Sequence, residues 1–317
     1  LALDANTVGD RSVAVGYSAL GSQNPASNAD MNNTAVGYNA GGGLTTGIKN
    51  TLIGSVAGDA ITTADNNTAV GFSALTANTT GASNTAIGKD SLAANTTASN
   101  NIAVGLGALK DNTTGATNTA IGSEALNNNT TASNNTAVGA DALYTNTTGA
   151  GGTAVGAASL DAVTTGDYNT GVGFTSGSKV TTGTRNVALG AFALQEATTG
   201  NDNTYVGYAA GAATTTASDN TAVGKSALAA NTTGASNVAV GALALDANTT
   251  ASANTAIGVS ALTSNTTGAS NTAVGTHSLD ANTTGGNNVA VGRNALLANT
   301  TASNNVAVGL AALTTNT

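Results

Sequence analysis

The sequence predicts a parallel β-solenoid, an all-β fold in which each turn of the chain stacks on the turn before it. The first observation is that every seventeenth residue from Gly37 to Gly309 is a glycine, and a fixed period of this kind indicates a repeat fold. The second is the tripeptide before each glycine, in which a Thr or β-branched residue, a small residue and an aliphatic residue alternate as in a short strand. The third is the Gly, Asn and Thr content of every repeat, which disfavours helix.

We call the recurring glycine the frame glycine and number the other positions of a coil from it. One further copy lies around Gly16, where the interval to Gly37 is longer by four residues, so the chain holds 18 copies of the repeat. Coils stacked about 4.8 Å apart would form a rod roughly 85 Å long. We therefore expect one array over residues 1–317, with the four extra residues of the first repeat held in an extended outer loop at residues 21–32.

The faces of the strand follow from its alternation. Positions −3 and −1 share one face, and we expect them to fill the coil together with the Leu at +4, which would lie on a second short strand. Position −2, nearly always Ala, would then form an exposed apolar stripe, and such stripes usually mark an interface. A small ring of subunits would cover it. The alanines expected at this subunit interface are Ala35, Ala69, Ala86, Ala103, Ala120, Ala137, Ala154, Ala188, Ala222, Ala239, Ala256, Ala273, Ala290 and Ala307.

Two further columns predict the corners of the coil. From Asn33 on, Asn stands at position −4 in every repeat except that of Gly152. Asn tolerates left-handed backbone, and stacked amides can hydrogen-bond from coil to coil. The frame glycine suits a corner that needs positive φ or close backbone approach. Glycine replaces the +4 leucine in four coils, which we expect to be less well filled; these glycines are Gly41, Gly58, Gly177 and Gly211.

Composition excludes several classes of function. The net charge is −8 and the eight basic residues are scattered, which argues against nucleic acid or acidic membranes as partners. Without cysteine there is neither a disulfide nor a thiolate metal site. No stretch has the length and apolarity of a membrane helix. Asp90, Glu124 and Asp141 are isolated, so no carboxylate pair is available for acid–base catalysis. We expect no catalytic residue, no metal, no cofactor and no enzymatic activity.

The repeat resembles the head repeat of the YadA-like trimeric autotransporter adhesins. Asn33-Thr34-Ala35-Val36-Gly37-Tyr38-Asn39-Ala40-Gly41 carries the resemblance, which recurs in register over the whole chain; similar repeats occur in phage and cyanobacterial fibre proteins. The resemblance implies a left-handed β-roll, three of which pack into a homotrimeric rod that attaches to a surface, a matrix protein or a glycan. This coil is longer than is usual in the family, and the sequence shows no neck, stalk or membrane-anchor pattern.

The expected function is thus that of an extracellular adhesin head or fibre segment at a cell or virion surface, with a phage tail or capsid fibre shaft as the alternative. Because Leu1–Thr7 and residues 313–317 each read as part of a repeat, we expect the chain to be a segment of a longer protein. The variable positions after the frame glycine are the candidates for surface recognition. They hold the aromatic residues Tyr17, Tyr38, Phe72, Phe174, Phe192 and Tyr208.

Three other motifs have simpler interpretations. Thr pairs such as Thr79-Thr80 form regular columns like those of ice-binding solenoids, which is a third and weaker alternative for the function. Asn78-Thr79-Thr80 matches an N-glycosylation motif, but turn chemistry explains it equally well. His277, the single histidine, occupies a variable position and is expected at the surface.

Overall fold

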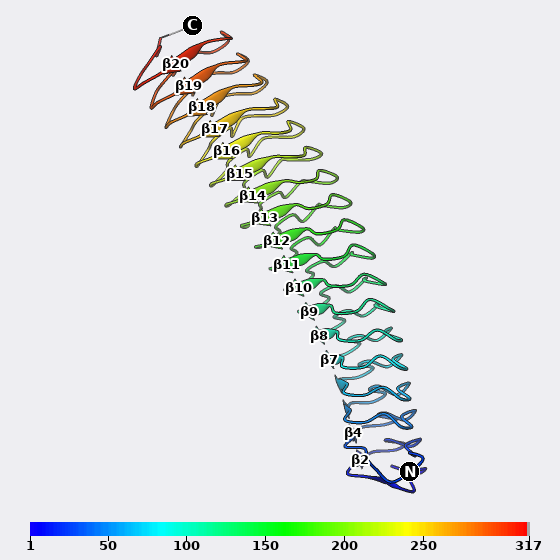
Figure 1. Ribbon diagram of the computed structural model, residues 1–317. Coiled ribbons are helices and arrows are strands. Elements are labelled where there is room, and N and C mark those ends of the chain that lie inside the picture. Colours follow the sequence, from blue (N-terminus) through cyan, green and yellow to red (C-terminus); the bar gives the residue numbers. More distant parts are fainter. Residues whose placement is uncertain (316–317) are drawn as a thin grey trace. The chain divides into compact units, whose positions relative to one another are not determined.

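The computed structural model describes residues 1–315; Asn316 and Thr317 lie outside the described residues. The chain divides into two units, Leu1–Ala157 and Ala158–Thr317. Each unit is a parallel β-solenoid with one short strand in nearly every coil (Figure 1), and no described residue is helical. One repeat of the sequence forms one coil, with about 18 turns in the two units together, so the predicted all-β parallel β-solenoid is confirmed.

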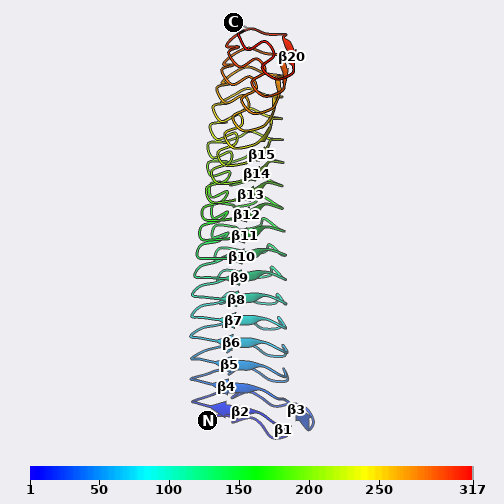
Figure 2. The same ribbon diagram turned by 90° about the vertical axis from the view of Figure 1, so that its left-hand side faces the viewer.

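The first unit begins with a small two-stranded sheet beside its first coil, formed by β1 and β3 (Figure 2). From β4 on, its strands follow at the repeat spacing. The strands of the unit are β1 (Gly9–Asp10), β2 (Val13–Val15), β3 (Ala29–Asp30), β4 (Thr34–Val36), β5 (Thr51–Ile53), β6 (Thr68–Val70), β7 (Thr85–Ile87), β8 (Ile102–Val104), β9 (Thr119–Ile121), β10 (Thr136–Val138) and β11 (Thr153–Val155).

The second unit holds nine strands of the same kind among its described residues. They are β12 (Thr170–Val172), β13 (Val187–Leu189), β14 (Thr204–Val206), β15 (Thr221–Val223), β16 (Val238–Val240), β17 (Thr255–Ile257), β18 (Thr272–Val274), β19 (Val289–Val291) and β20 (Val306–Val308).

Like residues lie opposite like residues, as the period predicts. In β10, Ala137 is opposite Ala120 of β9 and Ala154 of β11. The register survives the insertion in the first repeat, because Val13 of β2 still pairs with Thr34 of β4. Each strand therefore continues the ladder of its neighbours, and a slip by one residue would turn every side chain to the wrong face.

The strand faces are opposite to those expected. The Ala column at −2, from Ala35 to Ala307, lies inside the coil, with most of its members fully buried. Positions −3 and −1 point outward and remain partly or largely exposed. The predicted Ala interface is therefore wrong: these alanines contact the interior of their own chain, where the small side chain lets the strand approach the buried Leu of position +4.

No second strand forms around position +4 in the described residues; the segment is a run of turns. Its leucine adopts a left-handed backbone, as Leu126 does with φ 51°, and is fully or almost fully buried except for the exposed Leu313 of the last coil. That conformation costs a non-glycine residue about 1–2 kcal/mol. Burial of a leucine side chain returns about 1.5–3 kcal/mol, so burial offsets the backbone strain wherever this leucine is buried.

Coils that lack the +4 leucine are filled by larger residues from other columns, so the expectation of poorly filled coils is wrong. A Cβ added to Gly58 would meet Leu52 Cδ2 at 2.8 Å. A Cβ added to Gly211 would overlap the ring of Tyr205, the largest fully buried side chain. Leu52 and Tyr205 both replace Ala at −2. In these two coils the exchange of Leu for Gly at +4 accompanies the exchange of Ala for a large residue at −2, whereas the coils of Gly41 and Gly177 have Ala35 and Gly171 at −2.

The insertion at residues 21–32 does not lie wholly outside the coil, as an outer loop would. Residues 29–30 form β3, which pairs with β1. Met31 and Gln23 are fully buried, and Gln23 Oε1 accepts hydrogen bonds from Ser12 Oγ and Asn33 Nδ2 at 3.2 and 3.0 Å. The segment closes the first coil of the stack with both apolar and polar contacts.

Two ladders of buried asparagine run along the coils. At −4 the predicted ladder is confirmed: the Asn50 backbone N–H and Nδ2 both donate to Asn33 Oδ1, at 2.9 and 3.2 Å. The left-handed residue is the one before it, such as Lys49 with φ 59°. A second ladder at +7, in which Asn95 Nδ2 donates to Asn78 Oδ1 at 2.9 Å, was not predicted. Asn78 is fully buried and donates to the Gly81 carbonyl, so its glycosylation motif serves the turn.

Candidate interaction surfaces

The outward face of the strands forms an apolar column, which we call the aliphatic stripe. Although the strands above and below cover each side chain, Ile53, Ile87 and Ile121 keep exposures of 38, 40 and 41%. The stripe comprises position −1 of each coil, bordered by the Thr, Val or Ile of position −3. Its −1 members are Val15, Val36, Ile53, Val70, Ile87, Val104, Ile121, Val138 and Val155 in the first unit, and Val172, Leu189, Val206, Val223, Val240, Ile257, Val274, Val291 and Val308 in the second.

The aromatic candidates lie beside the stripe, at positions +1 and +2, and the structure groups five of the six. Tyr17 and Tyr38 stack with ring centroids 5.6 Å apart and planes 9° from parallel. Phe192 meets Phe174 and Tyr208 edge to face, at 5.6 and 5.7 Å. Phe72 neither stacks on another ring nor meets one edge to face among the described residues. All are largely exposed except Phe192, which is partly buried.

The Thr pairs have two separate roles. Thr79 Oγ1 donates to the Thr96 carbonyl at 3.1 Å, and the same bond links the first Thr of most neighbouring coils. Only the second Thr, such as Thr80, is exposed. One exposed Thr column in each unit is narrower than the doubled array that the sequence suggested.

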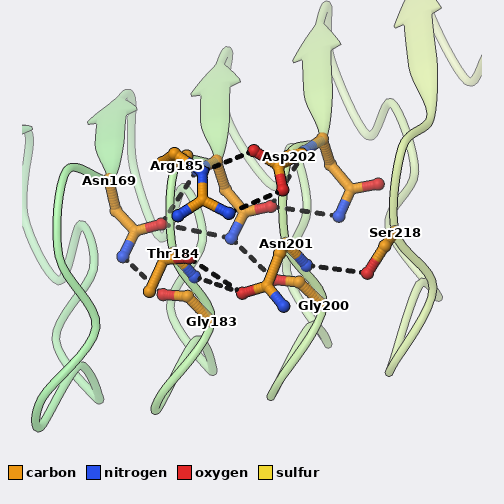
Figure 3. Close-up of polar contacts among 10 residues, drawn as sticks. Asn169, Gly183, Thr184, Arg185, Gly200, Asn201, Asp202 and Ser218 are labelled. Atoms are coloured by element: carbon orange, nitrogen blue, oxygen red, sulfur yellow. Dashed lines mark hydrogen bonds and ion pairs between the residues drawn. The ribbon is translucent and has the colours of Figure 1, made fainter.

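Polar side chains also link neighbouring coils at the corner before the strand (Figure 3). Thr184 N–H donates to Asn201 Oδ1 at 2.8 Å, and Asn201 N–H donates to Ser218 Oγ at 3.0 Å. On the outside, Arg185 holds Asp202 through two hydrogen bonds of 2.6 and 2.8 Å. These bonds raise the pKa of Arg185 and lower that of Asp202. Because the pair is exposed to solvent, its contribution to the free energy of unfolding is small. Its main effect is to fix the alignment of the two coils.

The described residues show no arrangement typical of a catalytic or metal centre. His277, partly exposed as expected, pairs with Asp280 at 3.0 Å. Residues 1–315 contain no group of three or more His, Cys, Asp or Glu side chains that could hold a metal, and no pocket was found among them. No described segment forms a helix long and apolar enough to cross a membrane.

One buried titratable group gives a test of the packing. Tyr205 hydroxyl accepts a hydrogen bond from Thr214 Oγ1 at 3.0 Å, and burial raises the pKa of Tyr205 from 10.0 to about 12. In the unfolded chain this tyrosine ionises first, so between pH 10 and 12 the unfolded state binds fewer protons. The group's contribution to stability is complete below pH 10 and is lost as the pH rises to 12.

We therefore expect the free energy of unfolding of the second unit to fall by about 2–3 kcal/mol across this pH window. Urea denaturation, followed by circular dichroism from below pH 10 to about pH 12, would measure the loss. In Tyr205→Phe the loss of unfolding free energy that is due to ionisation of Tyr205 should disappear. An unchanged pH slope in that variant would show that another group is responsible.

A comparison with models of known protein families found no match to this chain, and a comparison with curated protein sequences found none either.

Proposed function

We propose that this chain is a non-enzymatic segment of an extracellular fibre or adhesin head, which assembles as a homotrimer and attaches to a surface through many repeated contacts. Repetition along a stack of identical coils gives avidity without one strong site. The resemblance of the repeat to YadA-like adhesin heads supports this proposal. The observation that carries it is the aliphatic stripe.

The stripe requires a cover that a single chain does not provide. Its β-branched side chains stand on a regular β-surface and continue from coil to coil in each unit. Contiguous exposed apolar patches of this kind mark interaction sites. The strands above and below occupy the hydrogen-bonding edges, so a partner meets side chains rather than a free strand edge. Identical chains around a common axis would bring like positions together.

Assembly is tested by charging the stripe. We expect the wild-type chain to sediment at about three times its mass of 30.0 kDa. In the double variant Ile121→Glu with Val138→Glu, like charges would meet at the interface. The protein concentration below which the assembly dissociates should then be at least about tenfold higher than for the wild type.

The matched control places the same two charges on the same two coils, at exposed positions away from the stripe: Thr131→Glu with Thr148→Glu. This variant should keep the wild-type mass. A monomeric wild-type chain, or equal dissociation of the two double variants, would contradict an interface on the stripe.

The two alternatives call for other measurements. A phage or capsid fibre shaft would use the same trimer, and only the domains joined to this segment separate it from an adhesin. Ice binding would depend on the exposed Thr column at +9, because the hydroxyl of the first Thr is bonded within the ladder. Thermal hysteresis of the purified chain tests that alternative, and its absence would remove it.

A further inference from the structure

A patch of exposed rings spans consecutive coils of the second unit. Phe174 and Tyr208 occupy position +1 two coils apart, and Phe192 occupies position +2 of the coil between them. Phe192 is nearly perpendicular to both neighbours, at 84° and 82°. Phe174 and Tyr208 remain more than half exposed. The three rings thus form a continuous aromatic surface that runs along the stack.

A cation continues this patch on the next coil. Lys225 follows Tyr208 at position +1, and the backbone of the two coils is joined there by a hydrogen bond from Ser226 N–H to the Tyr208 carbonyl, at 2.9 Å. Lys225 is exposed and has no ion-pair partner in the part of the chain that the structure describes. The stacked pair Tyr17 and Tyr38 has Ser55 at the equivalent place, so it lacks this feature.

We propose that Phe174, Phe192, Tyr208 and Lys225 form a binding site for an acidic polysaccharide, which lies along the coil axis. This inference rests on the attachment role proposed above and names the class of its ligand. The face of an aromatic ring carries negative charge, which attracts the weakly positive C–H groups on the face of a sugar ring. The ammonium group of Lys225 pairs with a carboxylate of the same ligand.

The charge of the patch distinguishes the polysaccharide from other anionic partners. Nucleic acid and acidic membranes bind through clustered cations, and this patch has one. A single cation beside three rings fits a ligand in which every charge is accompanied by the apolar face of a sugar ring, as in a polysaccharide with uronic acid units.

The repeat itself shows that the patch can be removed without harm to the coil. Position +1 holds Ala191 and Ala242 in other coils of this unit, and position +2 holds Ala209 with the same left-handed backbone as Phe192. Replacement of the rings by alanine therefore introduces a residue that the fold already accepts, and a loss of binding would not arise from unfolding.

The experiment compares an oligogalacturonate with the same oligosaccharide after methyl esterification of its carboxylates, by calorimetric titration of the full chain. We expect the free acid to bind more tightly than the ester. Tyr208→Ala should weaken binding of the acid roughly threefold to tenfold. Lys225→Gln should remove the preference for the acid over the ester.

Two control variants remove a similar group elsewhere: Tyr38→Ala takes a stacked ring from the first unit, and Lys110→Gln removes an exposed lysine that is not beside rings. Both should bind as the wild type does. The proposal is overturned if the acid does not bind, if the ester binds equally well, if the controls weaken binding as much, or if polyglutamate binds as tightly, which would indicate an acidic peptide. Sedimentation of the same samples shows separately whether the trimer forms.

Discussion

Replacement of Gly122 by alanine is expected to lower the free energy of unfolding of the first unit by about 3 kcal/mol or more. This frame glycine has φ +140°, a backbone region that side chains strongly disfavour. An added Cβ would overlap the carbonyl oxygen of Gly139 on the next coil and lie 2.5 Å from its carbonyl carbon. Both are backbone atoms, so the contact can be relieved only by a shift of one coil against the other.

Gly309 provides the control for this prediction. It has a similar φ of +129°, but an added Cβ would meet nothing within 4 Å. Gly309→Ala therefore retains the backbone strain and lacks the clash, and we expect it to cost about 1–3 kcal/mol in the second unit. Chemical denaturation monitored by circular dichroism would measure both variants. Equal losses would mean that backbone conformation alone, rather than the close stacking of coils, selects the frame glycine.

The stacking of the coils could be predicted from the sequence because a constant period indicates coils of equal length. The constant interval between repeats places glycine over glycine and Asn over Asn, and both columns have an evident physical use at a corner. The strand before each glycine followed from its alternation. The register across the insertion between Gly16 and Gly37 followed as well, because the same motif resumes after it.

The orientation of the strand could not be predicted in the same way. Alternation shows that positions −3 and −1 share a face, but it does not show which face is inside. The usual rule places larger apolar residues inside, and here it fails because the coil is narrow and the +4 leucine already fills it. A left-handed leucine is also contrary to local preference, so neither its conformation nor the absence of a second strand could be predicted.

One signal in the sequence did reveal the inward face. Leu52 and Tyr205, the large residues at position −2, occur in two of the four coils with glycine at +4, those of Gly58 and Gly211. Side chains exchange volume in this way only when they share a space. This covariation within the repeat places −2 beside +4 inside the coil. It also leaves −1 outside, where the aliphatic stripe and the aromatic patch become the candidate surfaces.

The inward Ala column leads to the prediction with the largest effect, Ala137→Glu. Ala137 is fully buried between identical alanines of β9 and β11, so a glutamate there would have neither space nor a partner for its charge. We expect a loss of more than about 4 kcal/mol in the free energy of unfolding of the first unit. Denaturation by urea would measure the loss. Circular dichroism of the variant without urea would show a weaker β-sheet signal than that of the wild type.

The comparison with the stripe variant Ile121→Glu, Val138→Glu separates folding from assembly. Val138 follows Ala137 directly but points outward, so the double replacement should lower the urea midpoint of the monomer much less than Ala137→Glu does, while it weakens self-association. Ala137→Glu should lower the midpoint at any protein concentration, because it acts within one chain. If Ala137→Glu instead dissociated the assembly and left a stable folded monomer, the alanines would face a partner after all, and the inward orientation of this column would be wrong.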